Sequence, residues 1–150
     1  MKVFYVLLLV AAATSSILKA PEDIPAPRLL RLEALDPPGF RVEWNPVKSK
    51  DESDPVIGYK VKVWEQQSIK VYNYEVIDGV NMLVEQTILS EFPRDDVPEW
   101  EPTVLMVESA ANPAAQYNNV KVGVQYEIRV QAYSNKYEGA LSDAMRIKIT

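Results

Sequence analysis

The sequence predicts an all-β fold of antiparallel strands, either a sandwich or a barrel. Apolar and polar residues alternate over several short segments, and turn-forming residues separate these segments. The alternation is clearest within residues 120–134, where apolar Tyr126, Ile128, Val130 and Ala132 alternate with Glu127, Arg129, Gln131 and Tyr133. A period of two places successive side chains on opposite faces, as in a half-buried strand. No window of eleven or more residues shows helical periodicity.

Three earlier segments have the same alternation. A proline-rich lead-in at residues 21–27 precedes a first strand at 30–34. The turn sequence Asp-Pro-Pro-Gly at 36–39 separates it from a second strand at 40–44, which ends before Asn45-Pro46. A third strand follows at 57–63. These short strands, divided by turn residues, are typical of a meandering antiparallel architecture.

The order of these features resembles a fibronectin type III domain, which would cover about residues 25–150 within a unit spanning 21–150. The features are a proline-led first strand, Trp44 closing the second strand, Tyr59-Lys60-Val61 in the third, Gly123 with Tyr126–Ala132 late in the chain, and Gly139-Ala140-Leu141-Ser142 before a last strand. This resemblance implies an immunoglobulin-like antiparallel β-sandwich. We expect that fold class, with an additional inserted hairpin or loop.

The resemblance also implies structural roles for single residues. Trp44 would be the large core residue of strand B, between the two sheets. Tyr126 would open strand F and bond through its hydroxyl to backbone a few residues upstream, as in a tyrosine corner. Val120 stands where the family usually has Leu. The core would then contain Trp44, Tyr59, Val61, Val120, Tyr126, Ile128, Val130 and Ala132.

The segment between Trp64 and Val120 is about twice as long as the family needs, so we expect an insertion at about 66–119. Its first part predicts a β-hairpin, with residues 69–77 pairing with 82–89. The pair Asp78-Gly79 lies near the reversal and is typical of a tight hairpin turn.

The second part of the insertion contains less regular signals. Residues 91–102 hold three spaced prolines, which exclude regular strand structure there. Residues 103–108 predict strand E of the family pattern, or a replacement for it. Residues 109–119 are small and polar and predict a loop.

The first twenty residues have the layout of a secretory signal peptide. Lys2 precedes an apolar run at 3–13, followed by small residues at 14–16. The cleavage site lies between residues 16 and 20. Ala20 is small, but Pro21 directly after it would hinder processing, so Ser16 is a competing site. The alternative is a buried N-terminal strand or helix. We expect a secreted, extracellular protein without a membrane anchor, since no later apolar run is long enough to span a bilayer.

Composition excludes several functions. The chain has no histidine and no cysteine, so serine–histidine and cysteine–histidine catalysis, the common zinc sites and disulfides are all excluded. We expect neither enzymatic activity nor a cofactor. The formal net charge is −5, and it becomes −7 without the two lysines of residues 1–20. An acidic chain without a basic cluster is a poor candidate for binding nucleic acid or anionic membranes.

The segment 91–102 is rich in acidic residues, which raises two hypotheses about its chemistry. Clustered carboxylates could hold calcium, but the spacing matches no calcium-loop pattern, so a solvated surface loop is favoured and no metal site is expected. Paired acids could also hydrolyse glycosides, which requires a cleft that a small sandwich does not offer.

Four aromatic residues of the insertion are the predicted partner-binding residues: Tyr72, Tyr74, Phe92 and Trp100. Aromatic side chains among polar residues are typical of recognition surfaces. The alternative is that they cap an edge of the sandwich core, and the sequence does not decide between the two. The family also often contacts ligands through its B–C and F–G loops, here about 46–56 and 134–139.

The sequence thus favours a secreted, non-enzymatic protein-binding module that recognises an extracellular protein or receptor through loops and the insertion. The alternative is a small carrier of a lipid or hormone, with a pocket under the insertion lined by Met82, Leu83, Leu105 and Met106. The inserted hairpin adds strand edges, so the sequence also allows a weak dimer through an edge strand.

Overall fold

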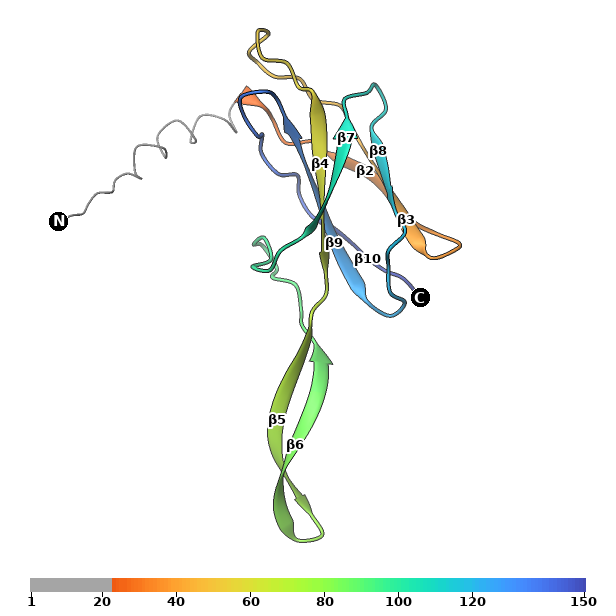
Figure 1. The fold of residues 1–150 in the computed structure, drawn as a ribbon, viewed down its shortest axis with the longest axis vertical. Coiled ribbons are helices and arrows are strands. Elements are labelled where there is room, and N and C mark those ends of the chain that lie inside the picture. Colours follow the sequence, from red (N-terminus) through yellow and green to blue (C-terminus); the bar gives the residue numbers. More distant parts are fainter. Residues whose placement is uncertain (1–22) are drawn as a thin grey trace, which may run out of the picture.

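The structure is a computed structural model that describes residues 23–150, in which nine strands form three antiparallel sheets (Figure 1). The signal-peptide prediction for residues 1–20 lies outside the described residues. The strands are β2 (Leu29–Leu35), β3 (Gly39–Trp44), β4 (Gly58–Glu65), β5 (Ser68–Ile77), β6 (Val80–Leu89), β7 (Thr103–Glu108), β8 (Ala114–Tyr117), β9 (Gln125–Tyr133) and β10 (Met145–Lys148).

Two of the sheets form a sandwich, which confirms the predicted fold class. One sheet has the order β10-β9-β4-β7 and the other β2-β3-β8. The alternating apolar residues of β3, β4 and β9 meet between them, and the Trp44 ring packs edge-on against Tyr59 at 5.4 Å. The buried core includes Phe40, Val42, Trp44, Tyr59, Val61, Val63, Tyr126, Ile128, Val130 and Ala132, with Val120 partly buried against it.

Tyr126 joins the start of β9 to the end of β4. Its hydroxyl accepts a hydrogen bond from the backbone N–H of Lys121 at 2.7 Å and donates to Glu65 Oε1 at 3.1 Å. The N–H of Lys121 lies five residues upstream, as the resemblance to a tyrosine corner implies. The aromatic rings of Phe40 and Tyr117, from the other sheet, lie 6.2 and 6.3 Å from the ring of Tyr126. One side chain thus links a loop and both sheets.

The strand predicted at residues 103–108 is confirmed as β7, but its assignment as strand E was wrong. β7 pairs with β4 at the edge of the four-stranded sheet. The strand that pairs with β3, in the place expected for strand E, is β8, which lies inside the segment predicted to be a loop. The sequence signal of β8 is weak because Ala-Ala-Gln-Tyr is short and small alanines dominate it. The segment that connects β4 to β7 and contains the hairpin spans residues 66–102.

The predicted hairpin is confirmed, although its second strand begins at Val80, two residues before the predicted position. β5 and β6 pair continuously from Ser68↔Leu89 to Ile77↔Val80. Asp78 and Gly79 form the connection and both have positive φ, 52° and 78°. Positive φ at both central residues matches the twist of paired strands in a two-residue turn. The hairpin projects away from the sandwich as a long ribbon (Figure 1).

We expect the stability of the sandwich to fall at alkaline pH through Tyr126. Burial of the phenol, with Glu65 also nearby, raises the pKa of Tyr126 to about 12. Because an unfolded tyrosine ionises near pH 10, the stabilisation is complete below pH 10 and is lost as the pH rises toward 12. Over that interval, the free energy of unfolding should fall by up to about 2–3 kcal/mol through this group. Urea unfolding at pH 7 to 11.5 measures this.

The matched variant is Tyr126→Phe. It removes the ionisable hydroxyl and should lower the free energy of unfolding by about 1–2 kcal/mol at neutral pH. Its stability should then decline less steeply above pH 10 than that of the original chain. Equal alkaline slopes in the two proteins would contradict the assignment.

Candidate functional site

The hairpin exposes an unusual amount of apolar surface. Ten of its apolar residues are between 42% and 77% exposed: Ile69, Tyr72, Tyr74, Val76, Ile77, Val80, Met82, Leu83, Ile88 and Leu89. A large exposed apolar patch on a soluble protein typically marks an interaction site. The hairpin is therefore the candidate functional site.

One face of the hairpin carries both tyrosines, and we call it the tyrosine face. Because side chains alternate along a strand, Tyr72, Tyr74 and Val76 of β5 lie on this face, and the register adds Leu83 and Leu89 of β6. The Tyr72 hydroxyl donates to Glu85 Oε2 at 2.8 Å, and Lys70 Nζ lies 3.2 Å from the same carboxylate. Its hydrogen bond to Glu85 raises the pKa of Tyr72.

The opposite face, which we call the aliphatic face, is more apolar. Its apolar members are Ile69, Val71, Ile77, Val80, Met82, Val84 and Ile88. They are interrupted by Glu75 and by Asn73, whose Nδ2 donates to Gln86 Oε1 at 3.4 Å. A two-stranded ribbon normally buries one face and solvates the other. Here both faces present apolar side chains to the surroundings.

The long edges of the hairpin are also open among the described residues, since β5 pairs only with β6. The two-residue turn makes Ile77 and Val80 a hydrogen-bonded pair, and such pairs recur at every second residue. The residues between them direct their backbone N–H and C=O groups to the free edge of β5: Lys70, Tyr72, Tyr74 and Val76. Neither strand contains a proline or a register shift, two devices that blunt such edges.

Hydrogen bonds fix the base of the hairpin to the sandwich. The N–H of Ser90 donates to the carbonyl of Gln67 at 2.7 Å, and Gln66 Nε2 donates to the carbonyl of Ser90 at 2.7 Å. The backbone N–H of Gln66 donates to the carbonyl of Gln125 on β9 at 2.9 Å. The ribbon therefore leaves the sandwich from an anchored pair of chains.

Phe92 and Trp100 lie elsewhere, in the loop 91–102 that folds onto the outer face of the four-stranded sheet. Phe92 is only 8% exposed, and its ring lies 5.5 Å from that of Trp100. Trp64 Nε1 donates to the Trp100 carbonyl, and Trp100 Nε1 donates to the Glu65 carbonyl, each at 2.9 Å. Of the four aromatic residues predicted as contacts, the structure thus exposes two tyrosines on the hairpin and packs the other two against the sheet.

A buried carboxylate secures the same loop, and the sequence analysis missed it. Glu127 is fully buried, and the Nε atoms of Arg129 and Arg146 donate to it at 3.2 and 2.9 Å. The two guanidinium groups also donate to loop carbonyls, those of Asp96 and Pro93. Alternation in β9 placed Glu127 on the polar face, and only the folded loop covers that face.

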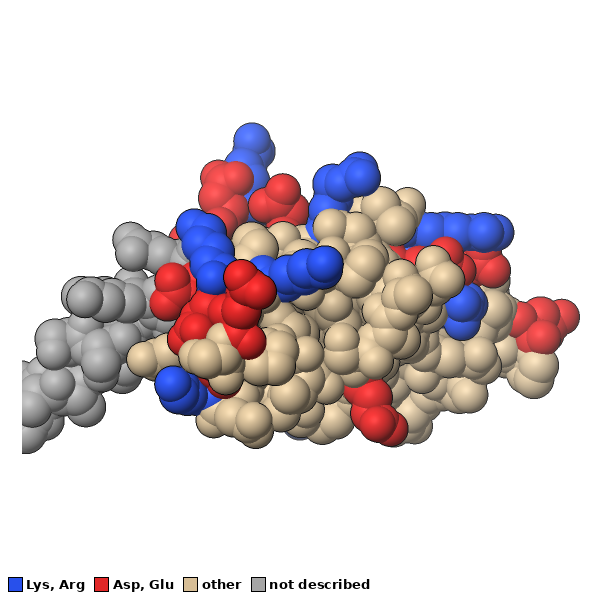
Figure 2. All heavy atoms as spheres, turned by 90° about the horizontal axis from the view of Figure 1, so that it is seen from above, with Lys and Arg blue, Asp and Glu red and all other residues tan. Residues whose placement is uncertain are grey.

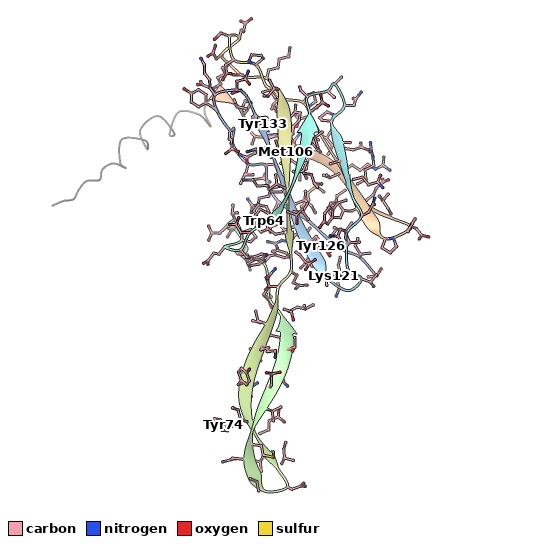
Figure 3. All side chains as sticks on the ribbon, viewed as in Figure 1. Trp64, Tyr74, Met106, Lys121, Tyr126 and Tyr133 are labelled. Atoms are coloured by element: carbon pink, nitrogen blue, oxygen red, sulfur yellow. The ribbon has the colours of Figure 1, made fainter. Side chains whose placement is uncertain are left out.

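The described part of the chain does not form the pocket predicted for a carrier. Met82 and Leu83 pair with Glu75 and Tyr74 near the tip of the hairpin, whereas Leu105 lies opposite Val61 in the sandwich. Figure 3 shows Tyr74 far from Met106 of β7. The predicted pocket is therefore wrong, because the tight turn and uninterrupted register extend the ribbon outward instead of folding it back.

The other predicted contact loops lie at the opposite end of β4 from the hairpin. Residues 46–56 and 109–111 border a surface pocket of about 510 Å³. The buried carboxylate of Asp54 accepts a hydrogen bond from Ser134 Oγ at 2.6 Å, which links the loops 46–56 and 134–139. Figure 2 shows acidic and basic side chains intermixed on this end of the molecule. Across residues 23–150, no group of three or more acidic side chains is arranged to hold a metal ion.

Comparisons with known proteins agree with this architecture. The family model described as "Fibronectin type III domain" matches residues 25–148. The chain is 26% identical over 124 residues to Contactin of Drosophila melanogaster, a match that covers 83% of this chain and 7% of that protein. The chain therefore spans less than a tenth of this relative.

Two solved structures are similar at low identity. A chain described as a myokine structure gives a TM-score of 0.45 at 15% identity, covering 83% of this chain and 95% of that one. A human fibronectin type III domain determined in solution gives a TM-score of 0.41 at 18% identity, covering 99% and 86%.

We expect Trp100→Ala to destabilise the protein and Tyr74→Ala to leave it nearly unchanged. Truncating Trp100 removes a hydrogen bond and the contact with Phe92, so the free energy of unfolding should fall by about 2–3 kcal/mol. Tyr74 makes only exposed cross-strand contacts, and its loss should cost less than about 1 kcal/mol. Urea unfolding measures both. An equal effect of the two substitutions would contradict the division into packed and exposed aromatic residues.

Proposed function

We propose that this chain, which belongs to the fibronectin type III family, is a secreted, non-enzymatic protein-binding module. It holds its partner with the β5–β6 hairpin. Members of this family generally bind other proteins and do not catalyse reactions. The family pattern accounts for the sandwich, and it does not require the hairpin between β4 and β7. The feature particular to this chain is therefore the place to seek its partner contact.

The observation that carries the proposal is the apolar surface on both faces of the hairpin. Ten exposed apolar side chains contribute nothing to the core of the sandwich. Burying them against another protein would remove that surface from water, which is the main driving force of association. Tyr72 and Tyr74 supply contact area at low cost in conformational entropy, as tyrosines at interfaces do.

The mode of recognition follows from the open edges. An extended segment of a partner can add a strand to an exposed edge, with main-chain hydrogen bonds giving affinity and alternate side chains giving specificity. The same edge residues that are unpaired in β5 carry the tyrosine face. Strand β5 would thus contact the partner both through its backbone and through its tyrosine rings.

Secretion is the second part of the proposal. The layout of residues 1–20 supports it, and no helix within residues 23–150 is long and apolar enough to cross a membrane. We propose an extracellular protein or receptor as partner. The acidic charge and the lack of a basic cluster argue against nucleic acid.

Secretion can be tested in cultured cells that express the full chain. We expect the protein in the medium, with an N-terminus that begins between residues 17 and 21. A variant with Leu7, Leu8 and Leu9 replaced by Asp should stay inside the cell, because the apolar core of a signal peptide is what its receptor binds. Uncleaved protein retained in the cytosol would overturn this part of the proposal.

The hairpin can be tested by shortening it without changing its turn. Removal of residues 70–77 and 80–87 joins Ile69 to Asp78-Gly79 and then to Ile88, which preserves a hydrogen-bonded pair beside the turn. We expect this variant to lose at least about tenfold in partner capture from extracellular fluid. The matched control, Val104→Ser with Met106→Ser, removes exposed apolar groups from β7 and should capture normally. Equal capture by the shortened variant and the original would overturn the proposal.

A further inference from the structure

The hairpin has only two strands, although it exposes apolar side chains on both of its faces. A two-stranded ribbon is marginal in water, and three or more strands or a packed face are needed for stability. Both faces of this ribbon are apolar, both of its long edges are open within the described chain, and the sandwich does not cover it (Figure 1). A partner that supplies strands in register would form hydrogen bonds with the free backbone N–H and C=O groups of the edge and would widen the sheet.

We propose that this partner is a second copy of the same chain, paired antiparallel through β5. The two hairpins would form one four-stranded sheet in the order β6-β5-β5-β6, with a two-fold axis perpendicular to it. Such an interface is isologous, so the strand must be complementary to itself. The inference rests on the proposed function and changes one detail of it: a second copy of the chain, and not another protein, adds its strand to the β5 edge. Other proteins would then contact the exposed faces of the wider sheet.

The backbone of β5 suits this pairing. Lys70, Tyr72, Tyr74 and Val76 direct their N–H and C=O groups to the free edge. In a register centred on Asn73 these four residues face one another across the seam, Lys70 opposite Val76 and Tyr72 opposite Tyr74 of the second copy. They would exchange about eight main-chain hydrogen bonds, a number within the range of typical protein interfaces.

The side chains favour the same register. Centring on Asn73 places Tyr72 against Tyr74 of the second copy twice, and Ile69 against Ile77 of the second copy twice. Aromatic and β-branched pairs of this kind stabilise neighbouring strands. Centring on Tyr72 instead would give a single tyrosine pair, Tyr72 opposite its own copy, and would lose the pairing of Ile69 with Ile77. The register centred on Asn73 therefore gives the larger number of matched pairs.

Charge distinguishes the β5 edge from the β6 edge. In the preferred register, Lys70 lies opposite Val76 and Glu75 lies opposite Val71 of the second copy, so like charges do not meet. On β6, a register centred on Glu85 would set two carboxylates directly against each other, which is destabilising. A register centred on Val84 avoids this contact, but β6 contains no aromatic residue and therefore forms no tyrosine pair. Self-pairing is thus less favourable on β6.

The shape of the molecule permits the pairing. The hairpin extends beyond the sandwich, and Tyr74 lies on the part of the ribbon remote from it (Figure 3). Antiparallel pairing would direct the two sandwiches to opposite ends of the shared sheet. The product would carry four tyrosines, Tyr72 and Tyr74 of each copy, on one continuous face.

The first test uses the chain purified from the medium of expressing cells and measures its mass by sedimentation equilibrium, alongside two proline variants. Tyr74→Pro removes an N–H directed to the free edge of β5, and proline is tolerated at such edge positions. Leu83→Pro is the matched control, because Leu83 lies directly opposite Tyr74 and its N–H is directed to the free edge of β6. We expect a dimer for the original chain and for Leu83→Pro, and at least about a hundredfold weaker dimerisation for Tyr74→Pro.

The second test uses the absence of cysteine from the chain. In the proposed register, Asn73 faces Asn73 of the second copy as a non-hydrogen-bonded pair, with Cα atoms about 4.5 Å apart, which a disulfide can span. Asn73→Cys should therefore form a covalent dimer on mild oxidation. Val84→Cys is the control, since Val84 lies opposite Asn73 on β6 and would be about 14 Å from its copy.

Three results would overturn the inference: an original chain that sediments as a monomer at its highest soluble concentration, a Tyr74→Pro dimer as tight as that of Leu83→Pro, or equal cross-linking of the two cysteine variants. These measurements use the purified chain alone. A monomer whose shortened-hairpin variant loses partner capture would contradict the dimer and leave the proposed function standing. A dimer whose partner capture survives shortening would do the reverse.

Discussion

Glu65 is the residue on which the arrangement of the molecule depends. It ends β4, and its carboxylate accepts from the Tyr126 hydroxyl and from Lys121 Nζ at 3.1 and 2.9 Å. Its carbonyl accepts from Trp100 Nε1 at 2.9 Å. One residue therefore joins the start of β9, the packed loop 91–102 and the point where the chain leaves for the hairpin. The part-buried setting of its contact with Tyr126 strengthens that bond relative to one in water.

The insertion consists of two parts with opposite physical characters. The loop 91–102 has no regular structure, yet it is held by aromatic packing around Phe92 and Trp100 and by the arginines that share Glu127. The hairpin keeps an uninterrupted register over ten residue pairs and packs hardly at all against the sandwich. In this insertion, the segment with regular secondary structure is therefore not the segment that packs against the sandwich. The regular part is the one left free to contact other molecules.

Much of the fold could be predicted from the sequence, and the failures have physical causes. The strands that carry Trp44, Val61 and Tyr126 alternate clearly because one of their faces is buried. β8 lacked this signal because four residues with two alanines hardly alternate in polarity. The burial of Phe92 and Glu127 could not be predicted from the sequence either. It depends on a loop that folds back over a face of the sheet, and alternation assigns that face to solvent.

Local chemistry in the sequence determined that this chain makes a β-sandwich and an inserted hairpin with a turn at Asp78-Gly79. These features follow from alternation, turn residues and backbone angles, which act over a few neighbours. Only the tertiary structure decided that β7 pairs with β4 and that the hairpin extends outward, leaving Tyr72 and Tyr74 exposed while Phe92 and Trp100 are packed. Sheet order and burial depend on contacts between residues far apart in the chain, and alternation within one strand does not specify which strand will lie beside it.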